Sequence, residues 1–142
     1  VEHVGDYTRE DWNQAETARR FECGSPNNMG IHALKQSLEL LLNYGIDQVY
    51  SDIIERCRHI ETQLVEMGCI LISEQDKDKR SGIVTFLHPS IDSEELYKHL
   101  MNNQVLCAYR GGGVRFSPHF YTSRSSIDRA MHILKEYLQH NT

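Results

Sequence analysis

Two arginines on either side of a glycine turn are the residues of this chain best suited to bind an anion. Arg110 and Arg115 flank residues 111–114 in the stretch YRGGGVRFSPHFY. Short β-rich runs on both sides predict two strands joined by this turn, which places both guanidinium groups near one rim of a sheet. Arginine presents a rigid fork of donors that matches a carboxylate or a phosphate. Two interpretations stay open from the spacing alone: an anion clamp, or two strand-end arginines in solvent.

A second candidate anion site is the turn Gly24-Ser25-Pro26-Asn27, which opens a predicted helix. The backbone N–H groups at a helix start are unpaired and face outward, and the Ser25 hydroxyl lies beside them. A phosphate fits such a place. Capping of the helix by the same polar residues explains the pattern as well.

Helical periodicity dominates the segments that must position these residues. Apolar residues step by three or four along residues 29–45 and again along residues 46–67, and Gly45 and Gly68 close the two patterns. Asp92 or Ser93 can cap a short helix, and a final helix begins at about Ser125. The sequence therefore predicts four helices.

Short β-rich runs lie between the second helix and the last. They predict strands at residues 69–73, 82–87, 104–109 and 114–117. The first two should pair as a hairpin across the hydrophilic stretch EQDKDKRS. The order ααββαββα predicts an α/β fold with a small, largely antiparallel sheet flanked by helices.

Together, the two candidate anion sites resemble the C-terminal part of class V aminotransferase-like enzymes. This group includes cysteine desulfurases, selenocysteine lyases, kynureninases and isopenicillin-epimerase-like proteins. The family pattern reads RFE-x-GTPN, then a long helix, and near the end an R-G turn followed by VR-x-S-x-x-x-YN. Residues 20–27 and 110–121 carry these patterns here, and the resemblance covers residues 18–138. It implies the small C-terminal domain of a fold-type-I transferase that depends on pyridoxal 5'-phosphate.

The resemblance also implies roles for individual residues. Arg115 falls where the family binds the substrate's α-carboxylate, Arg110 matches a second arginine on the active-site rim, and His119 lies close enough for a secondary contact. Ser25 replaces a threonine that reaches the cofactor phosphate of a neighbouring subunit, with Gly24 and Asn27 beside it. A phosphate contact that crosses subunits implies a homodimer.

Catalysis in this family depends on a lysine that binds the cofactor covalently, and it belongs to the large N-terminal domain. The lysines of this chain lie on predicted helix faces or in the polar loop, so none is assigned that role and no catalytic residue is expected here. Only residues 111–114 separate the arginines, which leaves no room for the catalytic cysteine loop of the desulfurases. Amino-acid transamination, elimination and epimerisation stay open for the parent enzyme, and the isolated chain is expected to be inactive.

The composition of the chain limits which binding partners and which cellular compartment are expected. The formal net charge of −5, with both signs interspersed, argues against nucleic acid and anionic membranes. The four cysteines form no CxxC pair and are interpreted as reduced thiols, which favours a cytoplasmic location. The eight histidines do not fall at metal-ligand spacing, so no metal site is expected.

The start of the chain is typical of a piece of a longer protein. The sequence begins with Val1 and not with a methionine, and about 25 residues pass before any strong periodic pattern appears. We expect residues 1–28 to be a remnant of the large cofactor-binding domain with its connector. Residues 29–142 would form the small domain with the long connecting helix. A stand-alone anion-binding module and a dimerisation domain built on the first helix are the alternatives.

Overall fold

The computed structural model describes residues 5, 8, 10, 13–22 and 24–141, and the chain divides into two compact units, residues 1–43 and 44–142. The first unit contains a 3-10 helix, η1 (Ala18–Phe21), and most of α1 (Asn28–Tyr44). Thr17 caps η1 by accepting the Arg19 N–H through Oγ1 at 3.4 Å. Asn27 opens α1, because its Oδ1 accepts the Gly30 N–H at 2.9 Å.

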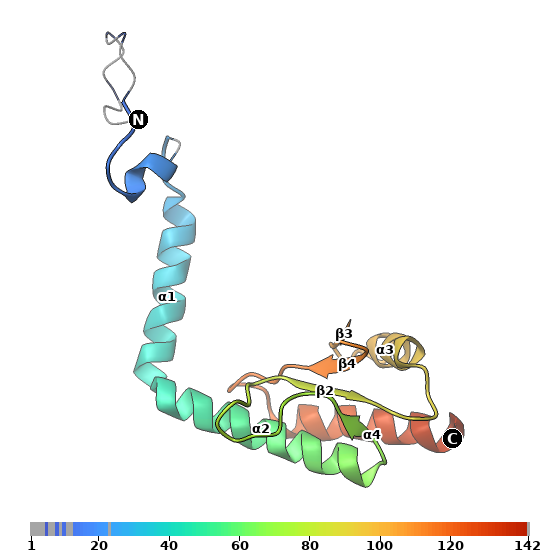
Figure 1. The fold of residues 1–142 in the computed structure, drawn as a ribbon. Coiled ribbons are helices and arrows are strands. Elements are labelled where there is room, and N and C mark those ends of the chain that lie inside the picture. The colour runs from blue at the N-terminus through green and yellow to red at the C-terminus, as the bar shows by residue number, and fades with distance from the viewer. Residues whose placement is uncertain (1–4, 6–7, 9, 11–12, 23, 142) are drawn as a thin grey trace. The chain divides into compact units, whose positions relative to one another are not determined.

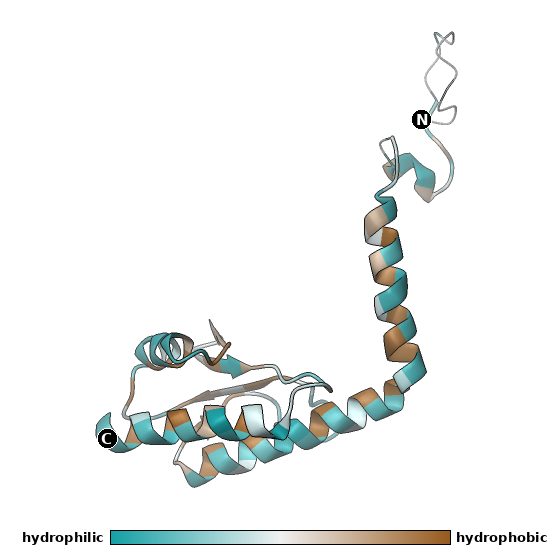
Figure 2. Cartoon of the chain, turned by 180° about the vertical axis from the view of Figure 1, so that it is seen from behind, coloured by the Kyte–Doolittle hydropathy of each residue, from teal (hydrophilic) through white to brown (hydrophobic). Residues whose placement is uncertain are grey.

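Helix α1 buries none of its residues. Its apolar side chains include Met29, which is 85% exposed, and Leu42, which is 72% exposed. Brown, hydrophobic positions recur along the whole helix (Figure 2). Because a soluble helix normally hides its apolar stripe, α1 has a face with no covering within its own unit.

The second unit places a small sheet against three helices. Its four strands run in the order β1-β2-β4-β3, and every neighbouring pair is antiparallel. Helices α2 and α4 lie side by side along one face of the sheet, and α3 lies beside β3 and β4 (Figure 1). The predicted α/β order ααββαββα is confirmed. The elements are α2 (Ile46–Glu66), β1 (Ile70–Leu71), β2 (Val84–Leu87), α3 (Ser93–Asn102), β3 (Ala108–Arg110), β4 (Gly113–Phe116) and α4 (Arg124–Asn141).

Alternation along the central strands separates the two faces of the sheet. Val84 pairs with Phe116 and Phe86 pairs with Val114, and all four side chains are buried in the core. The Phe86 and Phe116 rings lie 5.3 Å apart between their centroids. The residues between them, Thr85 on β2 and its partner Arg115 on β4, must therefore point to the opposite face.

The third strand is shorter than the sequence predicts, and the expectation of a strand over residues 104–107 is wrong. Gln104 and Val105 cap the C-terminus of α3 instead. The Gln104 N–H donates to the Met101 carbonyl at 3.0 Å, and the Val105 N–H donates to the Leu100 carbonyl at 2.9 Å. This is the Schellman arrangement, and it turns Gln104 into the left-handed region with φ 63°. A backbone used for this cap is not available for pairing in the sheet.

Candidate functional site

The glycine turn forms a tight hairpin between β3 and β4. Gly111 and Gly112 have φ values of 64° and 79°, which fits a two-residue type I′ turn, and Arg110 pairs directly with Gly113. In this turn both central residues need positive φ, which glycine adopts without strain. The turn therefore fixes the register of the two strands that carry the arginines.

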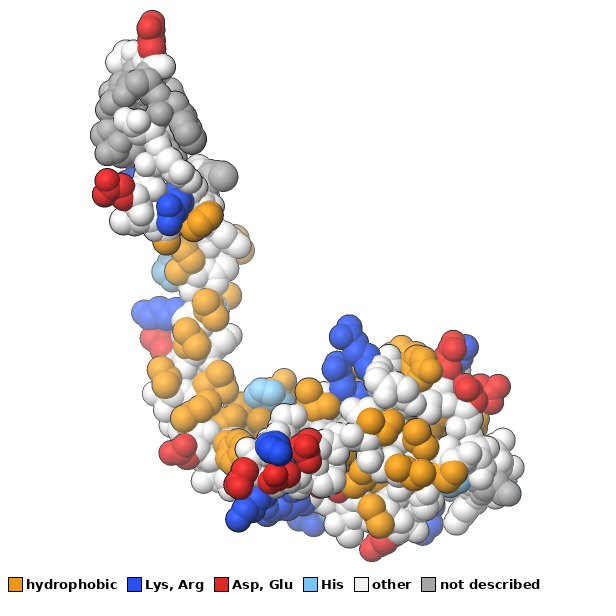
Figure 3. Space-filling model, in the orientation of Figure 1, with side chains coloured by type: hydrophobic (Ala, Val, Ile, Leu, Met, Phe, Trp, Pro, Cys, Tyr) orange, Lys and Arg blue, Asp and Glu red, His pale blue; other side chains and the backbone are white. Residues whose placement is uncertain are grey.

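That register places Arg110 and Arg115 on one face of the sheet. Directly paired residues point the same way, and Arg115 pairs with Ala108 on β3 and with Thr85 on β2. Arg110 lies two residues from Ala108 along β3, so it shares that face. This is the face opposite the core. Basic side chains stand out over the end of β3 and β4 (Figure 3).

The guanidinium of Arg115 is incompletely partnered. Its Nε is buried and has no hydrogen-bond partner in the described part of the chain. The ion pairs of the described residues include neither Arg115 nor the exposed Arg110. A buried N–H without a partner costs about 1–3 kcal/mol, so an anion in contact with Arg115 would recover a favourable interaction.

His119 lies just beyond β4, in a small aromatic group. Its ring stacks on Tyr121 at 4.3 Å and contacts Phe120 at 4.7 Å, between centroids. Its backbone N–H donates to the Thr122 hydroxyl at 2.9 Å, while the buried Nδ1 has no hydrogen-bond partner among the described residues. Among the described residues, no hydrogen bond or ring contact joins His119 to Arg110 or Arg115. These contacts hold the His119 ring in place, and they leave its Nδ1 unpaired among the described residues.

Gly24, Ser25 and Asn27 lie in the first unit, ahead of α1, and all three are exposed. The Asn27 side chain is used as a helix cap, as is its carbonyl, which accepts the Ile31 N–H at 3.0 Å. The Ser25 hydroxyl has no partner among the described residues, so it remains a free donor beside a helix N-terminus. The chemistry of this donor set fits a phosphate group. The two candidate sites fall in different units.

The lysines are all exposed. Lys35, Lys79 and Lys98 form ion pairs with acidic residues three or four positions away on the same segment. The hydrogen bond and charge of Glu94 raise the pKa of Lys98. A lysine that attacks a carbonyl needs a lowered pKa in a desolvated pocket, and the surroundings of Lys98 act in the opposite direction.

The three described cysteines, Cys57, Cys69 and Cys107, are free thiols. Burial raises the pKa of each of them to about 11, and the charge of Glu61 adds to the effect at Cys57. A raised pKa keeps the thiol protonated and weakly nucleophilic. Cys23 lies outside the described residues.

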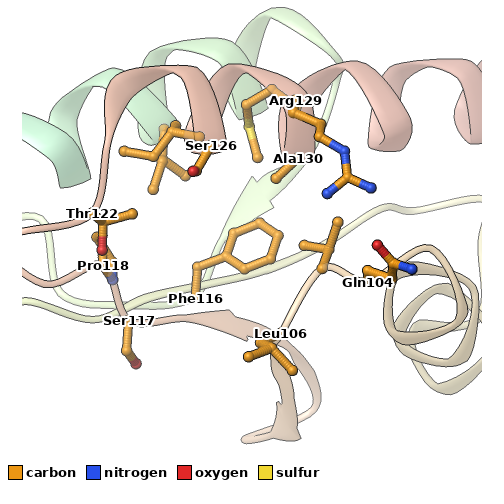
Figure 4. A pocket seen from close by; sticks show the side chains of 13 residues that line it. Gln104, Leu106, Phe116, Ser117, Pro118, Thr122, Ser126, Arg129 and Ala130 are labelled. Carbon is orange, nitrogen blue, oxygen red and sulfur yellow. The ribbon is translucent and has the colours of Figure 1, made fainter.

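A pocket of about 400 Å³ lies on the other side of the sheet, between α4, β4 and the end of α3. Phe116 forms its centre, and the side chains of Gln104 and Arg129 approach one another at one end (Figure 4). The sequence does not predict this pocket, because its lining comes from segments far apart in the chain. Neither Arg110 nor Arg115 contributes to it.

Within the described ranges, no group of three or more His, Cys, Asp or Glu side chains could hold a metal ion. No helix in the part of the chain that the structure describes is long and apolar enough to cross a membrane.

Comparisons with known proteins agree on one family. The family model described as "Aminotransferase class-V" matches residues 2–129. The chain is 26% identical over 121 residues to the uncharacterized aminotransferase YcbU of Bacillus subtilis (strain 168), covering 85% of this chain and 32% of that protein. It is 25% identical over 129 residues to a kynureninase of Geobacillus thermodenitrificans (strain NG80-2), covering 87% and 30%. The chain thus spans about a third of the length of these curated relatives.

A solved structure shows the same fold. The apo cysteine desulfurase from Thermococcus onnurineus NA1 superposes with a TM-score of 0.80 at 19% sequence identity. The match covers 89% of this chain and 35% of that chain.

Proposed function

Because the chain belongs to the class V aminotransferase family, whose members depend on pyridoxal phosphate, we propose that it is the part of an amino-acid-transforming enzyme that binds the substrate's α-carboxylate through Arg115. The activity of the whole enzyme is part of this proposal, since the chain spans only about a third of its relatives. Transamination, elimination and epimerisation are the reaction classes that we propose for it.

The buried, unpartnered Nε of Arg115 is the observation that carries the proposal. The strand holds this arginine between Thr85 and Ala108, two small residues, so its fork is positioned by β4 rather than by an acidic partner. A carboxylate is the anion that matches the fork in a bidentate geometry. In the proposed enzyme, Arg115 orients the amino acid and keeps its carboxylate away from the bonds that react.

A matched pair of ligands tests the role of Arg115. L-alanine and L-alaninamide differ at the α-carboxylate, and the Nε–H signal of Arg115 can be followed by ¹⁵N NMR. We expect L-alanine to shift this signal and L-alaninamide to leave it in place. The backbone amides of residues 114–116 should respond in the same way, and their response should be lost in Arg115→Gln and kept in Arg129→Gln, since Arg129 lies on α4. Equal responses to both ligands would rule out carboxylate recognition by Arg115.

Gly24, Ser25 and Asn27 are the residues that we propose to contact the cofactor phosphate. Support comes from the free Ser25 hydroxyl beside the N-terminus of α1. Bound pyridoxal phosphate supplies an electron sink for the bonds at the α-carbon of the amino acid. Pyridoxal phosphate should shift the backbone amide signals of residues 24–31, whereas pyridoxal, which lacks the phosphate, should not. Ser25→Ala should weaken the response and Ser25→Thr should keep it.

We further propose a cytoplasmic homodimer that uses none of its own cysteines as a persulfide carrier. The raised pKa values of Cys57, Cys69 and Cys107 support the last part for the three described cysteines, because protonated thiols are poor nucleophiles. His119 is proposed as a secondary contact of the substrate through its open Nδ1. The uncovered apolar residues of α1 support an association with a further protein surface.

A further inference from the structure

We infer that Arg110 and Arg115 together select an amino acid whose side chain carries a second carboxylate, as in a four- or five-carbon dicarboxylic amino acid. The inference rests on the proposed function, in which Arg115 binds the α-carboxylate. Arg110 is the specificity-determining residue: it binds the carboxylate at the other end of the same substrate.

The register of the hairpin sets the spacing of the two strand positions that carry Arg110 and Arg115. Arg110 is opposite Gly113, and Arg115 follows two residues later on the same face of β4. The arginines are thus diagonal neighbours, which in a sheet are roughly 7–8 Å apart, with their Cβ atoms somewhat closer. That separation allows each guanidinium to bind a carboxylate of its own. It suits two carboxylates joined by two or three carbon atoms, with the long arginine side chains closing on each end.

Small residues lie beside Arg115 on this face of the sheet. They are Ala108, Thr85 and Gly113, and Ile72, which follows β1, shares the face next to Thr85. A Cβ atom on Gly113 would lie 2.9 Å from Ile72 Cδ1 and closer still to the Phe86 carbonyl oxygen, so no side chain can replace it there. The Ile72 side chain therefore lies against Gly113, and the low part of this face next to Arg115 is formed by Ala108 and Thr85.

The charge of this face is uncompensated within the described residues. Arg80 and Arg124 pair with acids, and Arg56 and Arg129 donate to backbone carbonyls, but no such partner is found for Arg110 or for Arg115 Nε. Two guanidinium groups without an acid between them favour a ligand with two negative charges.

Isosteric amino acids test the inference on the 142-residue chain. L-glutamate and L-glutamine have the same shape and differ by one charge, and both can be titrated while the Arg115 Nε–H and the backbone amides of residues 108–116 are followed by NMR. We expect L-glutamate to bind roughly tenfold more tightly than L-glutamine, since one added charge-assisted hydrogen-bonded contact is worth about that factor. In Arg110→Gln the preference should disappear while the affinity for L-glutamine stays unchanged. Arg110→Lys should retain part of it, because an ammonium keeps the charge but loses the fork.

The possible outcomes separate the inference from the function on which it rests. Equal binding of the two ligands, or a preference that survives Arg110→Gln, would overturn the role of Arg110 and leave carboxylate binding by Arg115 intact. If neither ligand binds, both proposals fail. Arg110 is exposed at a turn, and an unchanged amide spectrum outside residues 108–116 will show that the variants fold.

Discussion

The carboxylate of Glu61 on α2 and the guanidinium of Arg80, just ahead of β2, form an ion pair in which the two side chains are only 12% and 9% exposed. The pair raises the pKa of Arg80, chiefly through the hydrogen bond that Arg80 donates to the Glu61 carboxylate. The ion pair links the polar loop after β1 to α2, which packs against the sheet. A pair so poorly hydrated contributes chiefly through the cost of breaking it.

Removal of one member of this pair should therefore destabilise the chain strongly. Arg80→Met leaves the Glu61 carboxylate buried without its partner, and we expect a loss of about 3 kcal/mol in the free energy of unfolding. The double variant Glu61→Leu with Arg80→Met should recover most of that loss, because no charge stays buried. Urea unfolding of the two single variants and the double variant measures the coupling. If the effects of the two substitutions on the free energy of unfolding are strictly additive, Glu61 and Arg80 are not coupled.

The buried thiols should make the fold sensitive to alkaline pH. The pKa of Cys57 is about 11 in the folded chain and about 9 for an ordinary thiol, so the folded state retains the proton longer. The stabilisation is complete below pH 9 and is lost as the pH rises from about 9 to 11. In a Cys23→Ser background, the remaining thiols should react with iodoacetamide at pH 8 about 100-fold more slowly than in urea. A similar rate in both conditions would show that the thiols are accessible.

Pyridoxal phosphate should not label one particular lysine of this chain in preference to the others. All lysines are exposed, and Lys98 is stabilised in its charged form by Glu94. After addition of the cofactor, borohydride reduction and mass mapping, we expect partial and scattered modification, with Lys135 as reactive as Lys35. One stoichiometric adduct would show that the chain contains a catalytic lysine. Lys98→Arg is the matched control, since it keeps the ion pair.

Gln104→Gly should stabilise the chain. Gln104 has φ 63° at the position after a helix C-cap where glycine is preferred, and a residue with a Cβ is strained there by about 1 kcal/mol. Glycine loses part of this gain through the greater freedom of the unfolded chain, so we expect a net increase of about 0.5 kcal/mol in the free energy of unfolding. Gln104→Ala, which retains the Cβ, should show no increase. A decrease for the glycine variant would point to side-chain contacts at the pocket.

Local patterns predicted most of the fold. The spacing of Ile53, Cys57, Ile60 and Leu64 predicts α2, and all four are in or against the core. Asp92 caps α3 as predicted, because its carboxylate accepts the Glu94 and Glu95 N–H groups at 2.9 and 3.0 Å. These features depend on residues within one turn or one strand of each other, so the sequence is enough to locate them.

Features that depend on distant residues were not predicted. Nothing in the sequence pairs Glu61 with Arg80, which are 19 residues apart. The sequence predicts a strand at Gln104 because its β-branched and apolar neighbours favour one, whereas in the structure this backbone caps α3. For the site, the glycine turn predicts that Arg110 and Arg115 lie near one rim of the sheet, whereas their common face follows from the strand register in the structure. The roles of these residues in binding stay predictions.

Because the apolar side chains of α1 are uncovered, hydrogen exchange of this helix would report whether the chain has assembled with another surface. A helix of 17 residues is marginal in water without tertiary packing, so its amides should exchange with deuterium far sooner than those of α2, which is packed against the sheet. Any surface that covers Leu34 and Leu38 would slow that exchange while leaving α2 unchanged. The time constant of amide exchange in α1 would then report which fraction of the molecules is bound to a partner, and this measurement needs neither a label nor an activity.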